Sequence, residues 1–259
     1  MKLSPIKNYY PYYNKDMLEQ KQWEKFYKKF TKLEITSEHI AIVDIIKDIT
    51  NPSYDIIDIG CGRGEYSFLF SKIYPKVYAL DIASSLIEDI NKEIKEKKID
   101  NIHTINMDYE KYNLKHDISF LSFSPCIQSI EDIKKVISLT NKYVFILTVD
   151  KGSKDRHRYE LIKKYPPKHM GGFIKDASII KGYLEELNIL YKEERFHNKS
   201  IEYMDKEEAI NYFITYFTSL GYKKEEIEEG IKEYITNNVI DNKLKETHMM
   251  NKSLIYFKV

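Results

Sequence analysis

Three glycines alternate with other residues immediately after a run of apolar residues that is typical of a buried strand. The run is Asp55–Ile59, and the glycines are Gly60, Gly62 and Gly64. Because glycine has no Cβ and adopts positive φ without strain, such a loop lets the main chain approach a ligand closely. The spacing therefore predicts a ligand-binding loop at the carboxyl end of the first strand of an α/β sheet.

The residue after the last glycine, Glu65, narrows the choice of ligand. A dinucleotide-binding fingerprint, Gly-x-Gly-x-x-Gly, would require a glycine at this position. Acidic residues accompany the loop instead: Asp58 lies in the strand before it, and Asp81 ends the next strand-like run. This arrangement resembles motif I and its continuation in class I S-adenosylmethionine-dependent methyltransferases, and the resemblance spans residues 53–149.

The resemblance implies a cofactor site with S-adenosylmethionine as methyl donor. The glycines would run beside its methionine moiety, and Asp58 would orient the loop and the cofactor's ammonium group. Asp81 would accept both ribose hydroxyls, because a carboxylate has two acceptor oxygens; capping a helix is its alternative role. Asp108 would meet the adenine amino group, with Tyr109 lining the ring, or would cap a turn. The predicted cofactor-binding residues are Asp58, Gly60, Cys61, Gly62, Gly64, Asp81, Ile82, Asp108, Tyr109 and Ser124.

Methyl transfer from a sulfonium needs alignment of donor and acceptor more than it needs a catalytic triad. Two residues are nevertheless candidates for catalysis. Cys126 follows Pro125, and a Pro-Cys pair at this location carries the nucleophile of cytosine-5 methyltransferases, although a small buried thiol is the alternative. His157, expected on a loop after the fifth strand, could take a proton from an acceptor hydroxyl, amine or thiol; the alternative is a solvated loop histidine.

Candidate substrate contacts lie outside the glycine loop. Arg156 stands in a basic segment beside His157 and could bind a carboxylate or phosphate of the substrate. Tyr10, Tyr13 and Trp23 have rings with polar tips that suit a half-buried acceptor wall, or that pack the N-terminal segment onto the core. No spacing of histidines and carboxylates indicates a metal site.

Strand-like and helix-like segments alternate from residue 55 onward and would position these side chains. Such alternation predicts a doubly wound, mainly parallel α/β sheet, and two late strands are expected to add an antiparallel pair at its edge. The fold expected is the seven-stranded, Rossmann-like methyltransferase sheet. Its strands are expected at 56–59, 77–80, 102–105, 118–123, 143–149, 190–196 and 253–259.

Two segments fall outside this minimal sheet. Residues 1–52 are expected to form an N-terminal aromatic and helical cap, and residues 53–259 the methyltransferase domain. Within that domain, residues 205–240 carry two amphipathic helical patterns, with Phe213 on the first and Ile227 on the second. This helical insertion is expected to be a lid over the acceptor or a dimer interface, so the protein is expected to be a monomer or a homodimer.

Composition limits the partners. The net charge is +1, and only four of the 41 basic residues are arginines, so a nucleic-acid substrate is unlikely on electrostatic grounds. Two cysteines, the absence of a leader-like start and the lack of a bilayer-length apolar run indicate a soluble, cytoplasmic protein without membrane contact. The leading hypothesis is methyl transfer to O, N or S of a small molecule. The alternatives are an RNA or protein methyltransferase and a cofactor-binding protein without catalysis.

Overall fold

The structure is a computed structural model of the chain that describes residues 33–152, 154–166, 175–219 and 221–259. The predicted aromatic residues Tyr10, Tyr13 and Trp23 lie outside this part of the chain. The chain divides into two compact units. The first, here called the sheet unit, comprises the described residues of Leu18–Val149, Ile174–Arg195 and Lys252–Val259; the second, the insert unit, includes those of Asp150–Phe173 and Phe196–Asn251.

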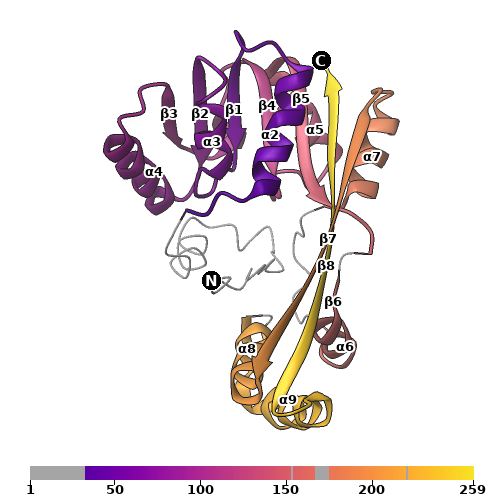
Figure 1. Ribbon diagram of the computed structural model, residues 1–259. Helices are drawn as coiled ribbons and strands as arrows, with labels where there is room; N and C mark the ends of the chain where they lie inside the picture. The colour runs from indigo at the N-terminus through magenta and orange to yellow at the C-terminus, as the bar shows by residue number, and fades with distance from the viewer. Residues whose placement is uncertain (1–32, 153, 167–174, 220) are drawn as a thin grey trace. The chain divides into compact units, whose positions relative to one another are not determined.

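The sheet unit is built on strands in the order β3-β2-β1-β4-β5-β8, with β7 paired to the outer side of β8 (Figure 1). The first five strands are mutually parallel, whereas β8 runs antiparallel to β5. This confirms the predicted seven-stranded, mainly parallel sheet with an antiparallel edge. The strands are β1 (Asp55–Ile59), β2 (Lys76–Asp81), β3 (Ile102–Asn106), β4 (His116–Ser122), β5 (Thr140–Val149), β7 (Lys192–Asp205) and β8 (Lys243–Lys258).

Side chains alternate between the two faces along each strand, so both faces of this sheet carry apolar residues. Helices cover both faces and bury these residues. On one face, Ile57 and Ile59 of β1 pack in a core that includes residues of α5 (Ile130–Ser138) and α7 (Ala177–Glu186). On the other, the ring of Phe120 on β4 contacts Tyr66 and Phe70 of α3 (Glu65–Phe70). The helix α2 (Ser37–Ile49) packs on α3, and α4 (Ser84–Lys97) covers β2 and β3.

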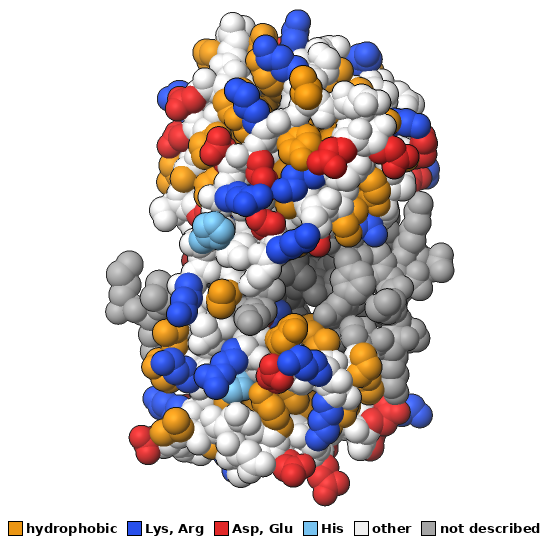
Figure 2. Space-filling model, turned by 90° about the vertical axis from the view of Figure 1, so that its right-hand side faces the viewer, with side chains coloured by type: hydrophobic (Ala, Val, Ile, Leu, Met, Phe, Trp, Pro, Cys, Tyr) orange, Lys and Arg blue, Asp and Glu red, His pale blue; other side chains and the backbone are white. Residues whose placement is uncertain are grey.

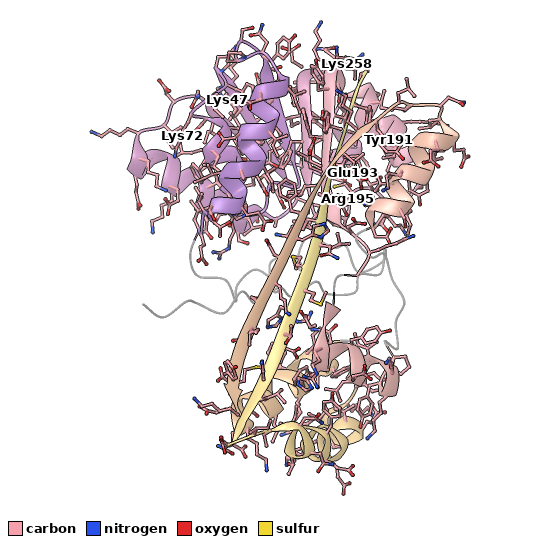
Figure 3. The ribbon with its side chains drawn as sticks, turned by 45° about the vertical axis from the view of Figure 1, so that its right-hand side comes forward. Lys47, Lys72, Tyr191, Glu193, Arg195 and Lys258 are labelled. Atoms are coloured by element: carbon pink, nitrogen blue, oxygen red, sulfur yellow. The ribbon has the colours of Figure 1, made fainter. Side chains whose placement is uncertain are left out.

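Glu193 holds the start of β7 to the rest of the sheet unit (Figure 3). Its carboxylate accepts hydrogen bonds from Lys181 Nζ on α7 at 3.0 Å, Ser253 Oγ on β8 at 2.8 Å and the Arg195 guanidinium at 2.9 Å. Burial alone would raise the pKa of Glu193, but these three hydrogen bonds hold it below the ordinary value. A carboxylate with three donors on two strands and a helix fixes the register of this edge.

The insert unit has a hydrophobic core of its own. Its helices are α6 (Arg156–Lys164), α8 (Lys206–Ser219) and α9 (Lys224–Asn238), and a short strand β6 (Lys154–Asp155) pairs with β8 as an eighth strand. The two helices predicted within residues 205–240 are present, but the unit also recruits α6 and parts of β7 and β8. A core that joins these elements makes the insertion a folded unit; its buried members include Leu161, Phe213, Phe217, Ile227, Ile231 and Leu244.

Candidate cofactor site

The glycine loop connects β1 to α3 with three residues in the left-handed region. The φ angles are 74° at Gly60, 56° at Gly62 and 82° at Gly64, values that favour glycine. The main-chain N–H groups of Gly60 and Cys61 both donate to the carbonyl oxygen of Leu80, at 2.8 and 3.0 Å. The loop is thereby tied to the end of β2, the strand that carries Asp81.

A steric constraint also requires glycine at position 60. A Cβ at this position would lie 2.7 Å from Ser124 Oγ, which is closer than a real Cβ contact allows. Ser124 lies in the loop after β4, so the side chain of this loop packs against the main chain of the loop after β1. Packing against Ser124, together with the positive φ, therefore requires glycine at this position.

Asp81 holds the glycine loop in place. Its buried carboxylate accepts hydrogen bonds from the N–H groups of Gly62 and Ala83, both at 2.9 Å. Burial raises the pKa of this carboxyl group although both hydrogen bonds lower it. Each carboxylate oxygen keeps a second lone pair. The N-cap of α4 is Ala83, so Asp81 is not the cap itself, and its contact with ribose stays a prediction.

Asp58 is completely enclosed behind the loop. Its single described side-chain partner is Ser67 of α3, whose Oγ donates to Oδ2 at 2.6 Å. Burial raises the pKa of Asp58 to about 7, with a further rise from the neighbouring charges of Glu65 and Asp81. The carboxyl group is therefore close to half-protonated at neutral pH, and a nearby ammonium group would favour its ionised form.

The residues predicted to meet adenine have visible roles in loop structure. Asp108 accepts a hydrogen bond from Glu110 N at 3.0 Å and caps the short 3-10 helix η2 (Tyr109–Lys111). The Tyr109 hydroxyl lies 2.8 Å from the carbonyl oxygen of Cys126 and 2.5 Å from Asp132 Oδ1. The Tyr109 hydroxyl therefore connects the loop after β3 to the loop after β4 and to α5.

Asn106 is a residue of this site that the sequence did not indicate. Asn106 ends β3, and its Nδ2 donates to the carbonyl oxygens of Asp81 and Ile82, at 3.1 and 3.0 Å. These bonds fix the main chain around the predicted ribose-binding acid. An amide side chain at the end of a parallel strand beside a functional acid is the signal that could have indicated it.

Cys126 is partly buried in the loop after β4. Burial raises the pKa of its thiol to about 12; the Ser124 hydrogen bond opposes this rise, and nearby carboxylates add to it. A nucleophilic cysteine needs a depressed pKa, because the thiolate is the reactive form. The structure therefore favours the buried-thiol interpretation over the nucleophile.

His157 and Arg156 belong to the insert unit, whereas the glycine loop belongs to the sheet unit. The expected loop around His157 is the first turn of α6, a segment whose Leu161 anchors it in the insert core. His157 is only 3% exposed, and its Nδ1 lies 3.0 Å from the Tyr234 hydroxyl. Burial, followed by the charge of Arg156, lowers its pKa. His157 is therefore a buried, packed histidine and not the solvated loop histidine that was the alternative prediction.

The described part of the chain shows neither a metal site nor a membrane span. It contains no cluster of three or more histidine, cysteine or acidic side chains able to hold a metal ion. Its helices also lack the combination of length and apolar character that a bilayer span requires.

Residues 56–142 match the sequence profile of the family described as "Methyltransferase domain". Curated relatives include a tRNA/tmRNA (uracil-C(5))-methyltransferase of Shewanella woodyi, 28% identical over 95 residues, which are 36% of this chain and 26% of that enzyme. Another is ribosomal RNA small subunit methyltransferase A of Wigglesworthia glossinidia brevipalpis, 32% identical over 112 residues, 42% of this chain and 41% of that enzyme. The chain thus spans less than half the length of these relatives, and their RNA substrates do not fit the expectation that nucleic acid is unlikely.

Solved structures share the fold at low sequence identity. YcgJ of Bacillus subtilis aligns with a TM-score of 0.58 at 11% identity, over 86% of this chain and 98% of its own. Magnesium protoporphyrin IX methyltransferase of Synechocystis, with S-adenosylhomocysteine bound, aligns with a TM-score of 0.55 at 11% identity, over 94% and 97% of the chains. The sequence profile therefore identifies a methyltransferase domain over residues 56–142, and the chain shares the fold of these solved structures.

Proposed function

We propose that this protein is an S-adenosylmethionine-dependent methyltransferase whose donor lies against the loop of Gly60, Gly62 and Gly64. One observation carries the proposal: three left-handed glycines are tied to the end of β2, where Asp81 fixes them through Gly62 N. The glycine loop thus lies beside Asp81, and Asp58 precedes it on β1. S-adenosylmethionine carries an ammonium group and two ribose hydroxyls, and the carboxylates of Asp58 and Asp81 are suited to accept hydrogen bonds from them.

Bound S-adenosylmethionine would supply an already activated methyl group. The task of the protein is then to hold donor and acceptor in line, an effect that is worth roughly 7–11 kcal/mol in favourable cases. Asp58 would pair with the ammonium group, and Asp81 would accept from the ribose with its remaining lone pairs. Tyr109 and Ser124 would keep the loops after β3 and β4 in place around the reacting atoms.

Calorimetric titration tests the cofactor. The wild-type protein should bind S-adenosylhomocysteine and should show no binding of NAD. Asp81→Asn should weaken S-adenosylhomocysteine by about 1.5–3 kcal/mol, the range for hydrogen bonds with a charged partner. Asp89→Asn, which removes an exposed acid of α4, is the matched control and should leave the affinity unchanged. Tight NAD binding without S-adenosylhomocysteine binding would overturn the proposal.

A small-molecule acceptor, methylated on O, N or S in the cytoplasm, is the finer part of the proposal. It is supported by the net charge of +1 and by a surface on which basic side chains stand among acidic and hydrophobic ones (Figure 2). The raised pKa of Cys126 also counts against covalent attack on a pyrimidine ring. The two free cysteines, Cys61 and Cys126, suit a reducing compartment.

RNA is the second candidate acceptor, because the curated relatives with sequence similarity act on tRNA, tmRNA or ribosomal RNA by name. Radiolabelled S-adenosylmethionine separates the two. Incubation with total RNA and, separately, with a small-molecule extract should place the label in the extract alone. Label in RNA that disappears on nuclease treatment would replace the small-molecule proposal with RNA methylation.

A further inference from the structure

The insert unit contains a surface hollow that the proposed methyl transfer does not use. The hollow has a volume of about 260 Å³ and is lined by Arg156, Tyr159, Glu160, Thr247 and Met249. The first three residues lie on one side, in the first two turns of α6, and the last two on β8. All five of these described lining residues belong to the insert unit.

The charge available in this hollow is that of Arg156. Among the described residues, no side chain forms an ion pair or hydrogen bond with its exposed guanidinium. Arg158, two residues on, is different: it is bound to Asp155 Oδ2 and to the Tyr212 hydroxyl, both at 2.6 Å. Glu160 is the acidic residue of the lining, and its charge is offset by Lys163 at 3.0 Å. The hollow therefore offers a guanidinium fork to an anion.

The remaining lining is suited to a flat apolar body. Tyr159 is 47% exposed and Met249 is 36% exposed, which is high for side chains of their size and apolar character. Lys163 Nζ lies 4.5 Å from the centroid of the Tyr159 ring, so a planar ligand would meet Tyr159 beside this lysine. A thioether such as that of Met249 makes favourable contacts with aromatic rings. The volume is slightly below the roughly 300–1,000 Å³ of typical ligand pockets, so a compact ring system is the size that fits.

The main chain beneath the lining is held firmly. The buried carboxylate of Glu246 accepts from the N–H groups of His157, at 3.1 Å, and of Thr247, at 3.0 Å. These bonds connect the residue after Arg156 to a residue of the opposite wall. On the other side of Thr247, the His248 ring lies 2.7 Å from Asp155 Oδ1. The two walls are thus fixed relative to each other before any ligand arrives.

We propose that this hollow binds a small planar carboxylate, whose carboxylate pairs with Arg156 and whose ring lies against Tyr159 and Met249. The proposal goes beyond methyl transfer and does not depend on it, because every contact lies within the insert unit. It also gives a specific form to the carboxylate or phosphate contact that the sequence predicts for Arg156.

NMR of protein labelled with ¹³C at its methionine methyl groups tests this proposal directly. The seven methionines give few signals, and Met249→Leu identifies that of Met249. Titration with 2-naphthoate should shift the Met249 signal saturably. The uncharged analogue 2-naphthamide should bind roughly tenfold or more weakly, because it forms no ion pair with the guanidinium.

Variants separate the guanidinium from the rest of the surface. Arg156→Gln should bring the affinities for naphthoate and naphthamide within about twofold of each other, and Arg156→Lys should give an intermediate preference. Lys47→Gln removes one exposed positive charge from α2 (Figure 3) and should retain the wild-type preference. Unchanged signals of the other methionines report that the variants are folded. Absence of a saturable Met249 shift with naphthoate, or equal binding of the two probes by the wild type, would overturn the proposal.

Discussion

Asp58 is a carboxyl group for which folding changes the protonation equilibrium. Its pKa rises from 3.8 to about 7, chiefly because of burial. A raised folded-state pKa means that the folded protein binds the proton more tightly, so the associated stability is complete below about pH 4 and is lost as pH rises through about 7. The shift corresponds to a loss of the order of 4 kcal/mol over that window.

Asp58→Asn should remove this pH dependence. Urea unfolding between pH 4 and pH 8 should show the free energy of unfolding of the wild type declining relative to that of the variant. Asp89→Asn, an exposed acid on α4, provides the matched control and should follow the wild type. Parallel profiles for wild type and Asp58→Asn would show that Asp58 ionises as easily in the folded protein as in the unfolded chain.

Two constraints act on Gly60, a positive φ angle and close packing against Ser124, and a double variant can separate them. Alanine at this position should be strained by the φ of 74° and should clash with Ser124 Oγ, 2.7 Å from the new Cβ. We expect Gly60→Ala to weaken S-adenosylhomocysteine binding at least tenfold, since left-handed strain alone costs about 1–2 kcal/mol. Ser124→Ala added to it should restore part of the affinity by removing the clash. Titration calorimetry on Gly60→Ala and on the double variant measures both contributions, and full affinity of Gly60→Ala would contradict this account.

Residue types predicted the position of the glycine loop better than they predicted the roles of single side chains. The three glycines and Asp81 come together as expected, because strand ends in a parallel sheet meet at one edge. The sequence could not show that the Tyr109 hydroxyl reaches Asp132, or that His157 is packed against Tyr234, since both contacts join distant segments. A histidine pattern alone does not distinguish a solvated ring from a buried one.

At the scale of single elements, two helical glycines form a matched pair. A Cβ on Gly230 of α9 would lie 2.0 Å from the Tyr165 hydroxyl, whereas a Cβ on Gly182 of α7 would meet nothing within 4 Å. Tyr165 cannot move freely, because its ring contacts Phe217 and Tyr222 edge-on. Gly230→Ala should therefore destabilise the insert unit by about 1–3 kcal/mol through overpacking.

Gly182→Ala should have the opposite sign. Alanine is favoured over glycine in a helix by about 0.8–1.0 kcal/mol, and here nothing opposes it. Thermal unfolding of both variants measures the two effects. Equal stabilisation by the two substitutions would indicate that Tyr165 gives way without loss of its aromatic contacts.

The sequence placed the central strands within a few residues but shortened the two edge strands. Apolar runs mark β1 to β5 because both faces of these strands are covered. β7 extends to Asp205 and β8 begins at Lys243, well beyond the expected 190–196 and 253–259. Most of the added residues of β7 are exposed on both faces, so no alternation of apolar and polar residues marks them. Only main-chain pairing identifies such strands.

At the scale of the whole molecule, two cores predict two unfolding events. Phe213→Ala removes a fully buried ring from the insert core and should lower the stability of that unit by about 3–5 kcal/mol. Differential scanning calorimetry should then resolve two transitions, and S-adenosylhomocysteine should raise only that of the sheet unit. The affinity of Phe213→Ala for this ligand should equal that of the wild type. A single transition that shifts as one with ligand would show that the shared strands couple both cores.

The position of β8 in the sheet has a consequence for synthesis of the chain. β8 pairs with β5, from Tyr143↔Lys258 to Val149↔Lys252, yet all other described strands precede it along the chain. A nascent chain that has completed β5 therefore presents an open and largely apolar strand edge while the helices of the insert unit are still being made. Unpaired edges of this kind recruit other strands. We expect ribosome-bound chains halted before β8 to aggregate or to bind a holding chaperone, although their glycine loop is already complete.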